Sequence, residues 1–508
     1  AYTGMLETDV DLIESEEEQD DNSVASAGTM DAYNELLGLI NPMSTTPISN
    51  AQYNVIKTKV DVVNLADYFI LNHYIGKTDW PDHNYNLYRA RVGPDTRFKF
   101  IAWDNDSGLN KVIQNTTLMT ETATYPYMMG PDGRMVPDTS KPLMLDAPIQ
   151  IFNRLTTNAE FRQVVTDRFY KNVVDPKGTL APARCAQIYT ELTNIVDQAV
   201  IGESARWGDY SRDKYPPTNL IGPLDKPFPA YLYSRDLPNA YTDPANAVAE
   251  DMQKTWLQVR GEKLNTYCPN RSNVVLSQYQ ANGWYVAPLN VPGISQRGGT
   301  VAAANPTVTL NNTLNNGTGD IYYTTNGVDP RQEFGTLAPN AIRGDGAGAD
   351  SATITISRAT TVKARVRNGN SWSPLLEYVF APTQALSNLV INEIHYLPTP
   401  PSPTLDAKQY EFIELYNSGT TPLQLDRVKF ARGITYEFPA NTDILPGQYL
   451  VLASNLGTFQ SRYGFAPWGV YQGSLANEGE SVELVDAIGT SIERVDYKGV
   501  APWPSLLA

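Results

Sequence analysis

The stretch VDVVNLADYFILNHYIGKTDWPDHNYNLYR (Val60–Arg89), continued by RFKFIAWDNDSGL (Arg97–Leu109), carries the most informative pattern of the sequence. In its first half, apolar residues recur at spacings of three and four, which places them on one face of a helix. Asp61 suits the N-cap position and Gly76 suits a C-terminal stop. The pattern therefore predicts a helix within residues 53–76.

Two short strands are predicted directly after this helix. Residues 85–90 (YNLYRA) and 98–103 (FKFIAW) are rich in aromatic and aliphatic side chains, and a Gly-Pro-Asp turn lies between them. Helical periodicity returns at residues 147–205 and 246–266. The first half of the chain is thus predicted to be mainly helical, with one hairpin between its helices.

Four polar side chains flank the predicted hairpin. Asp79 precedes Asn84 by five residues on one side, and Asp104 and Asp106 follow the second strand on the other. Phosphoryl transfer requires a carboxylate that accepts the proton of the acceptor hydroxyl, and oxygen ligands for Mg²⁺. Eukaryotic-type kinases place a base Asp, a metal-binding Asn, a hairpin and a metal-binding Asp in this order. The order predicts Asp79 as the base and the other three residues near a metal ion.

A purely structural explanation of the same residues stays open. Asp and Asn are common in turns, because their side chains bond to nearby backbone groups. On this interpretation Asp79, Asp82 and Asn84 cap local backbone groups, and Asp104 and Asp106 close a turn.

Length and charge narrow the classes of protein. A prior of about 150 residues per domain indicates three or so units in 508 residues. The formal net charge is −16 and no cluster of Lys and Arg occurs, which argues against nucleic-acid binding. No apolar run reaches the roughly 18 residues that span a bilayer. No signal peptide is recognised in these residues, and because the first of them read as the interior of a domain, a signal removed upstream stays open.

The remaining polar residues give weaker signals. The acidic run Glu7–Asp21 is typical of a solvated loop, with a metal site or a basic partner as the alternative. Cys185 and Cys268 are the only cysteines, and either one disulfide or two separate buried thiols fits them. No metal-ligand spacing joins the three histidines, His73, His83 and His395.

From about residue 272 the texture becomes that of an all-β protein. Short aromatic and β-branched runs alternate with Gly, Asn and Pro turns, at the spacing of sandwich domains. The segment APTQALS (Ala381–Ser387) separates two such regions and is predicted to be a linker.

The strands of the second β region show alternation. In LVINEIHY (Leu389–Tyr396) and EFIELYN (Glu411–Asn417), alternate positions are apolar, as in a half-buried strand. Glu393 and Glu414 in these strands are predicted to face outward, and metal binding is the alternative.

Residues 1–275 resemble the spore-coat protein H (CotH) kinase-like family, an atypical protein kinase family of spore coats and secreted bacterial proteins. The resemblance rests on the two stretches quoted first and on ESARWGDY (Glu203–Tyr210). It implies Mg²⁺ and ATP as cofactors, Asp79 as catalytic base, and a metal site of Asn84, Asp104 and Asp106. The third motif contains Glu203, Arg206 and Trp207. It is expected to form a buried Arg–carboxylate pair that stabilises the fold.

The sequence before Asp61 lacks the motifs of the N-terminal lobe, which binds the nucleotide in such kinases. Neither a G-x-G-x-x-G loop nor a V-A-I-K-like strand precedes Asp61. Residues 1–275 are therefore expected to form the mainly helical C-lobe of an atypical kinase without most of its N-lobe. This piece alone is expected to be inactive.

Two further resemblances cover the β regions. Residues 276–382 resemble a fibronectin-III-like or chitobiase C-terminal-type module, through IYYTTNGVDPR (Ile321–Arg331) and TTVKARVRNGNSWS (Thr360–Ser373). The Asn-Gly dipeptide in the first segment predicts a tight turn and a return strand. Residues 388–508 resemble a lamin-tail domain, an immunoglobulin-like sandwich whose last strand is expected to be cut short.

The expected fold class is a multidomain α+β chain, in which a kinase-like C-lobe precedes two all-β sandwiches. One implied function is a secreted or cell-surface kinase that transfers the γ-phosphoryl of ATP to protein Ser or Thr. The other is a non-catalytic structural or adhesive surface or matrix protein. The expected partners are a protein acceptor or surface and matrix proteins, with carbohydrate as a further partner.

Overall fold

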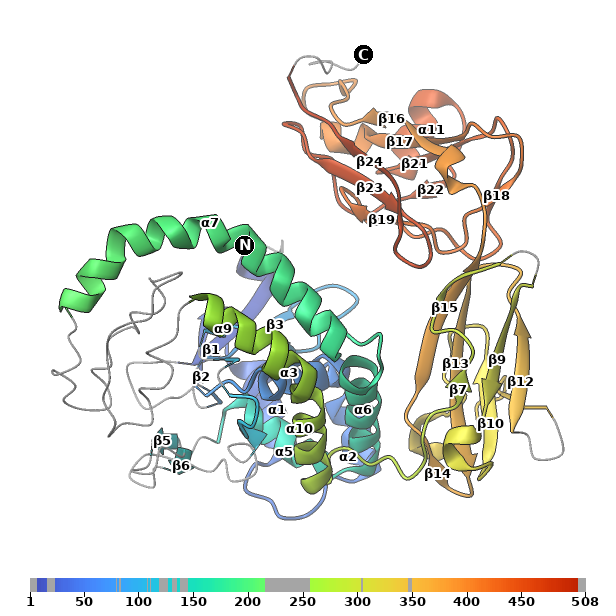
Figure 1. Cartoon of the computed structure of the whole chain (residues 1–508). Coiled ribbons are helices and arrows are strands. Elements are labelled where there is room, and N and C mark those ends of the chain that lie inside the picture. The colour runs from blue at the N-terminus through green and yellow to red at the C-terminus, as the bar shows by residue number, and fades with distance from the viewer. Residues whose placement is uncertain are drawn as a thin grey trace. The chain divides into compact units, whose positions relative to one another are not determined.

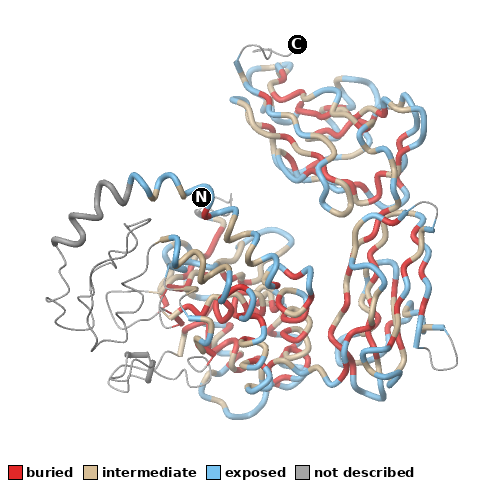
Figure 2. The backbone as a smooth tube through the Cα atoms, viewed as in Figure 1, coloured by how far each residue is buried: buried red, intermediate tan, exposed pale blue. Residues whose placement is uncertain are grey.

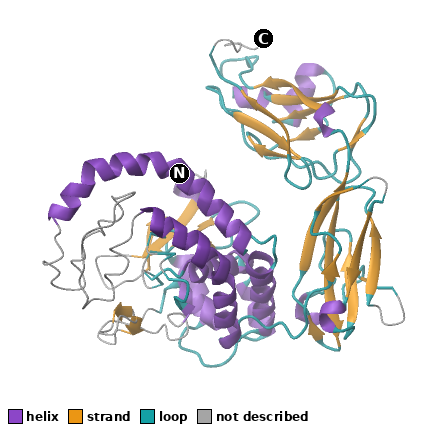
Figure 3. Cartoon of the chain, in the orientation of Figure 1, coloured by secondary structure: helices purple, strands orange, loops and turns teal. Residues whose placement is uncertain are grey.

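The computed structural model describes residues 7–15, 23–78, 80–81, 84–106, 108–109, 111–117, 127–129, 135–137, 145–214, 256–302, 305–345 and 350–500. For 127–129, 135–137 and 203–214 it describes the backbone only. The chain divides into two compact units, residues 1–287 and 288–508, which are described separately. Helices dominate the first and strands the second (Figure 3), which confirms a multidomain α+β chain.

The first unit packs its helices around a small sheet (Figure 1). The described helices are α1 (Asp31–Ile40), α2 (Asn50–Ile56), α3 (Val62–Ile75), α5 (Pro148–Thr156), α6 (Ala159–Phe169), α7 (Pro182–Lys214), α9 (Trp256–Glu262) and α10 (Cys268–Ala281). The described strands are β1 (Val10–Ser15), β2 (Ser23–Ala27), β3 (Asn86–Ala90), β4 (Lys99–Ile101), and a separate hairpin of β5 (Tyr127–Met129) and β6 (Met135–Pro137).

Helix α3 begins and ends where the sequence predicted. The Asp61 carboxylate accepts a hydrogen bond from the Asn64 backbone N–H at 3.1 Å, and Gly76 ends the helix with φ at +64°. The prediction of helix from residue 53 is wrong at one point, because α2 and α3 are separate helices. The break exists because residues 59–61 pair with Phe98, whose N–H bonds to the Lys59 carbonyl at 2.7 Å.

The sheet has the order β2-β1-β3-β4, so β1 lies inside it. The prediction that the acidic run is a solvated loop is therefore wrong for Val10–Ser15, which form β1. Asp11 on β1 is fully buried and pairs with Arg89 at 2.7 Å and Arg91 at 3.1 Å. These arginines lie on and just after β3, a long-range pairing that local charge density does not reveal.

Residues 147–205, predicted to be helical, form α5, α6 and the first part of α7. The all-β texture begins later than residue 272, because α10 continues to Ala281. A disulfide joins Cys185 of α7 to Cys268 of α10, with the Cα atoms 5.5 Å apart, and this settles the open question about the two thiols. It holds the two helices side by side.

Helix α3 is the buried centre of the first unit (Figure 2). Phe69 stacks on Phe152 of α5, with the ring centroids 4.2 Å apart. The His73 ring shares a hydrogen bond of 2.8 Å with the Tyr279 hydroxyl of α10. Burial, followed by the charge of Arg271, lowers the pKa of His73 to about 3. His73 is therefore a neutral core residue at physiological pH.

The second unit begins with a sandwich of two sheets, ordered β11-β10-β13-β15-β8 with β14 beside β13, and β12-β9-β7. Their bounds are β7 (Gly293–Ile294), β8 (Gly299–Val301), β9 (Thr307–Asn311), β10 (Asp320–Thr324), β11 (Ile342–Arg343), β12 (Ser351–Thr355), β13 (Thr360–Asn368), β14 (Ser371–Trp372) and β15 (Leu376–Pro382). No strand returns directly after Asn326-Gly327, and β10 pairs instead with β11 and β13. The Arg365 guanidinium holds the Asp329 carboxylate at 2.6 Å and so fixes this segment as a loop.

The last module has a four-stranded sheet, β16-β17-β21-β22, a three-stranded sheet, β19-β23-β24, and the pair β18-β20. The bounds are β16 (Leu389–His395), β17 (Phe412–Asn417), β18 (Leu423–Gln424), β19 (Lys429–Arg432), β20 (Asp443–Ile444), β21 (Tyr449–Ala453), α11 (Leu456–Tyr463), β22 (Gly469–Val470), β23 (Ser481–Val485) and β24 (Ser491–Asp496). Alternate residues of β17 are buried, as the sequence predicted for a half-buried strand.

The predicted linker is bonded to both β modules. Thr383 bonds through its N–H to the Val301 carbonyl at 3.2 Å, and the Gln384 side chain exchanges two 2.9 Å bonds with the Gln424 backbone. Within the described residues, no helix combines the length and the apolar character that crossing a membrane requires.

Candidate functional site

The hairpin brings Asn84 and Asp104 to the same end of the sheet. Strands β3 and β4 pair antiparallel, with Asn86 opposite Ile101. Asn84 comes just before β3 and Asp104 just after β4. Because antiparallel neighbours start and finish at a shared edge, the two residues leave the ladder together.

Both residues have an unusual backbone conformation. The φ angle is +56° at Asn84 and +43° at Asp104, in the left-handed region that side chains other than glycine seldom adopt. Asn and Asp tolerate this region best, and such positions concentrate at functional sites. Asn84 is buried, whereas Asp104 and Asp106 are exposed. This end of the sheet thus combines one buried amide residue with two exposed carboxylates.

Lys77 ties the two segments together. Its side chain is 0% exposed, and it directly follows the Gly76 that ends α3. The ammonium donates to the carbonyl oxygen of Asn84 at 3.1 Å and to that of Trp103 at 2.6 Å. A charged donor makes stronger hydrogen bonds than a neutral one. One buried cation therefore fixes the backbone of one predicted ligand and of the residue before the other.

The surrounding loops are anchored to the core. The Trp80 side chain is buried, and its indole N–H donates to the Tyr68 hydroxyl of α3 at 2.8 Å. After the second predicted ligand, the Leu109 N–H donates to the Ile75 carbonyl at 2.5 Å. The segment around Asp104 therefore returns to the end of α3, close to where the Asn84 loop starts.

Arg271 of α10 binds backbone carbonyls at the end of α3 and in the loop that follows Leu109. The guanidinium is fully buried and donates to the Tyr74 carbonyl at 2.6 Å and to the His73 carbonyl at the end of α3. It also donates to the carbonyls of Val112 at 2.8 Å and Gln114 at 2.6 Å. The last carbonyls of a helix lack partners within the helix and carry partial negative charge, which a cation stabilises.

Sequence reasoning missed both buried cations. Lys77 had a usable signal, since it lies between the helix stop Gly76 and the predicted base Asp79. Arg271 had none, because its partners are backbone atoms more than 150 positions away in sequence.

Several predicted residues lie outside the described part of the chain. They are Asp79, Asp82, His83 and, for their side chains, Glu203, Arg206 and Trp207. The role of Asp79 as base therefore stays a prediction. In the part that is described, no three or more His, Cys, Asp and Glu side chains are placed to hold a metal ion.

The predicted donor set nevertheless matches one class of ion. Amide and carboxylate oxygens are hard ligands, and Mg²⁺ is bound by one or two carboxylates together with water and substrate phosphates. Asn84 and the exposed Asp104 and Asp106 supply such oxygens at one edge of the sheet. The residues present fit Mg²⁺ bound together with a nucleotide, rather than a closed protein cage.

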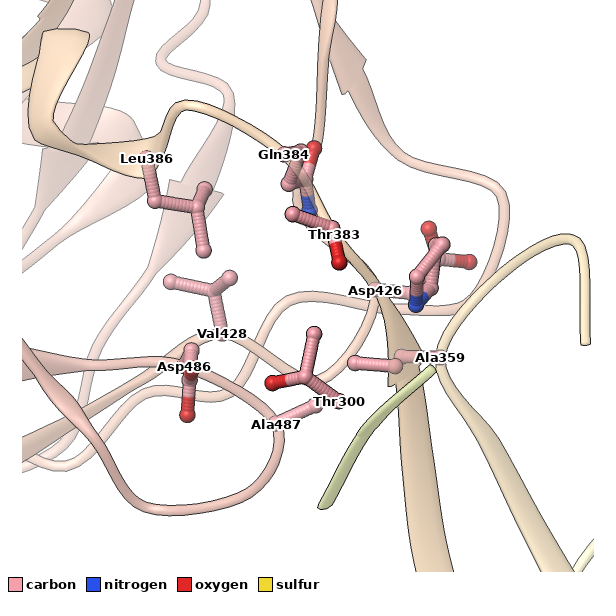
Figure 4. A pocket seen from close by; sticks show the side chains of 11 residues that line it. Thr300, Ala359, Thr383, Gln384, Leu386, Asp426, Val428, Asp486 and Ala487 are labelled. Atoms are coloured by element: carbon pink, nitrogen blue, oxygen red, sulfur yellow. The ribbon is translucent and has the colours of Figure 1, made fainter. Parts of the chain in front are cut away.

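The second unit contains a pocket of about 170 Å³ at the predicted linker (Figure 4). Its charged side chains already have partners. The Asp426 carboxylate accepts from the Arg358 guanidinium at 2.9 Å, and the Asp486 carboxylate accepts from the backbone N–H groups of Ile488 and Thr490. Both carboxylates that line the pocket are thus already hydrogen-bonded within the protein. The Asn84–Asp104 region is therefore the stronger candidate site.

The family model of the CotH kinase protein matches residues 6–263, half of the chain. The chain belongs to the CotH kinase protein family. The Lamin Tail Domain model matches residues 382–499, so the predicted order of these two modules is confirmed. The fibronectin-III-like or chitobiase-type assignment of residues 276–382 stays a prediction. No curated protein matches this CotH-family chain.

Three solved structures are similar to parts of this CotH-family chain. A DUF4876 family protein from Bacteroides thetaiotaomicron is 13% identical, with a TM-score of 0.16, over 37% of this chain and 64% of that one. The CupB2 chaperone of Pseudomonas aeruginosa is 11% identical, with a TM-score of 0.15, over 41% of this chain and 100% of its own. The YadV chaperone is 12% identical, with a TM-score of 0.17, over 41% of this chain and 99% of its own.

Proposed function

We propose that this chain is the kinase-like and β-modular part of a secreted or cell-surface protein that transfers the γ-phosphoryl of ATP to a protein Ser or Thr. The observation that carries the proposal is the pair of left-handed residues, Asn84 and Asp104, whose segments are joined on the buried Lys77 ammonium. The helical unit then corresponds to the C-lobe of an atypical kinase.

In the proposed phosphoryl transfer, each of these residues has a separate role. The acceptor hydroxyl oxygen forms a bond to the γ-phosphorus, the bond to the β–γ bridging oxygen breaks, and ADP leaves. Asp79 would accept the hydroxyl proton, and Asn84 and Asp104, with Asp106 nearby, would hold Mg²⁺. Bound Mg²⁺ neutralises charge on the phosphate oxygens. Lys77 and Arg271 act on backbone carbonyls and are positioning residues.

The Cys185–Cys268 disulfide supports a location outside the cytosol, because disulfides persist in oxidising compartments. Protein acceptors, surface or matrix proteins and carbohydrate are the partners that fit such a place.

A non-catalytic scaffold is the second candidate. It is favoured by the bonds between the two β modules, where Arg358 donates to Asp426 and to the Thr442 carbonyl of the lamin-tail module. These bonds hold the two β modules together within one compact unit, and none of them involves a predicted catalytic residue.

One experiment separates the two functions. The full-length protein is incubated with Mg²⁺ and γ-labelled ATP, alone and with surface extract, beside Asp79→Asn, Asp104→Ala and the distant control Asp345→Asn. Kinase function predicts labelling that both site variants abolish and the control retains. Absence of labelling supports the scaffold, whereas labelling that survives Asp104→Ala overturns the assignment of this site.

A further inference from the structure

The sheet β16-β17-β21-β22 carries an unusual set of side chains on one face. Glu393 lies directly opposite Glu414, and Tyr416 lies directly opposite Tyr449. Because side chains alternate between faces along a strand, residues 414 and 416 point to the same side. We call the four side chains Glu393, Glu414, Tyr416 and Tyr449 the Glu–Tyr face.

The two glutamates form a like-charge pair across neighbouring strands, an arrangement that destabilises a sheet. Burial, followed by the charge of Glu414, raises the pKa of Glu393. Among the described residues, neither carboxylate has a Lys or Arg within ion-pair distance. Asn392 steadies Glu414 through a 2.7 Å hydrogen bond to its Oε1 atom. The face therefore holds two negative charges that a cation from outside would relieve.

His395 is a second and independent sign of a binding site. The ring is 3% exposed, stacks on Phe412 with centroids 4.7 Å apart, and has no hydrogen-bond partner at either nitrogen. Its Nδ1 atom points at Glu393, 3.8 Å from Oε1. A buried polar group without partners is costly, so a ring of this kind beside a surface carboxylate needs an explanation, and a bound ligand supplies one.

The two tyrosines add an aromatic wall beside the charges. Their rings stack with centroids 4.4 Å apart, and Tyr449 is 51% exposed. An exposed tyrosine ring attracts a cation over its face. Carboxylates beside an open aromatic ring are therefore complementary to a cation with a flat apolar surface.

We propose that the Glu–Tyr face binds an arginine-bearing segment of a partner protein, with the guanidinium between Glu393 and Glu414 and against Tyr449. A guanidinium donates to two carboxylates at once and stacks on aromatic rings, which an ammonium does less well. A metal ion fits less well, because the described residues offer no group of three or more His, Cys, Asp and Glu side chains to hold it.

The test measures binding of hexa-arginine to the full chain by calorimetry at physiological salt, with hexa-citrulline as the neutral isosteric probe. Glu393→Gln/Glu414→Gln is compared with Glu478→Gln/Asp345→Asn, which changes the net charge equally at exposed positions elsewhere. The proposal predicts that the site variant loses about tenfold or more in affinity and that the control stays close to wild type. Tyr449→Ala is expected to weaken binding as well.

A thermal melt shows that the variants are folded. Because the like-charge pair destabilises the sheet, Glu393→Gln/Glu414→Gln is expected to melt no lower than wild type. Equal affinity of the two double variants overturns the proposal, since the attraction is then only the overall negative charge. Equal binding of hexa-citrulline, or of a neutral oligosaccharide at Tyr449, also overturns it. So does binding of Ca²⁺ alone that the site variant abolishes.

Discussion

Lys77 is the residue on which the candidate site depends most. Its buried ammonium bonds the carbonyls of Asn84 and Trp103, and Lys77→Met leaves both without this donor. We expect the free energy of unfolding to fall by about 1–3 kcal/mol. We also expect the affinity for Mg²⁺·ATP to fall, because the two segments lose their shared anchor. Urea denaturation and nucleotide titration check this, with Lys59→Met as a surface control; a variant that binds nucleotide as wild type does would contradict it.

Two buried groups of the lamin-tail module predict opposite pH effects. Burial raises the pKa of Glu411 from 4.5 to about 7, although a Leu475 N–H and the Tyr471 hydroxyl partly offset it. Burial, followed by the charge of Arg462, lowers the pKa of His395 from 6.5 to about 4. The protonated Glu411 carboxyl adds to the free energy of unfolding. This stabilisation is fully present below pH 4.5 and is lost as the pH rises to 7. The His395 contribution is fully present above pH 6.5 and is lost as the pH falls to 4.

The test is the pH dependence of unfolding for single variants. Relative to wild type, Glu411→Gln should gain stability as the pH rises from 4.5 to 7, and His395→Phe should gain it as the pH falls from 6.5 to 4. Each change is expected to be about 1–3 kcal/mol, because one pKa unit corresponds to about 1.4 kcal/mol. If the difference in stability from wild type changed with pH in the same direction for both variants, these groups would not titrate as proposed.

At the scale of elements, α10 connects the disulfide to the candidate site. Arg271→Met removes the donor from the carbonyls at the end of α3 and from Val112 and Gln114. The expected loss of stability is about 3–5 kcal/mol, because several buried carbonyls lose a charged partner at once. Hydrogen exchange of the Leu109 amide, which bonds to Ile75, should also accelerate. The matched control Arg184→Met changes an exposed arginine of α7; equal effects of the two variants would refute the role of Arg271.

The elements that sequence predicted best are those with local signals. Helix α3 is bounded by its own cap residues, Asp61 and Gly76, and the hairpin follows from its aromatic and aliphatic residues and the turn between them. The elements missed depend on distant partners. Strand β1 reads as a charged loop until Arg89 is seen to neutralise Asp11. The burial of Lys77 likewise depends on two carbonyls that only the folded hairpin brings together.

At the scale of the whole molecule, we expect the contacts of Arg358 to make the two β modules unfold together. Its guanidinium bonds to Asp426 at 2.9 Å, to Asp443 at 2.8 Å and to the Thr442 carbonyl at 3.1 Å. Because Asp426 is buried, Arg358→Ala leaves a buried carboxylate without its cation, at a cost of about 1–3 kcal/mol.

Calorimetry of the full chain should then show the two β modules melting separately in Arg358→Ala and together in wild type. The surface pair of Arg343 and Asp320 provides the control, and Arg343→Ala should leave the melting profile unchanged. Separate melting of the modules in wild type would show that the contacts of Arg358 do not couple them.

The most direct test of the central claim is whether Asn84 and Asp104 bind one metal–nucleotide complex. Mn²⁺ replaces Mg²⁺, and electron paramagnetic resonance of the full-length protein counts bound Mn²⁺ with and without ATP. We predict that ATP-dependent binding of Mn²⁺ is lost in both Asn84→Ala and Asp104→Ala and is kept in Asp345→Asn. Binding of Mn²⁺·ATP that neither site variant changes would contradict the assignment of this site.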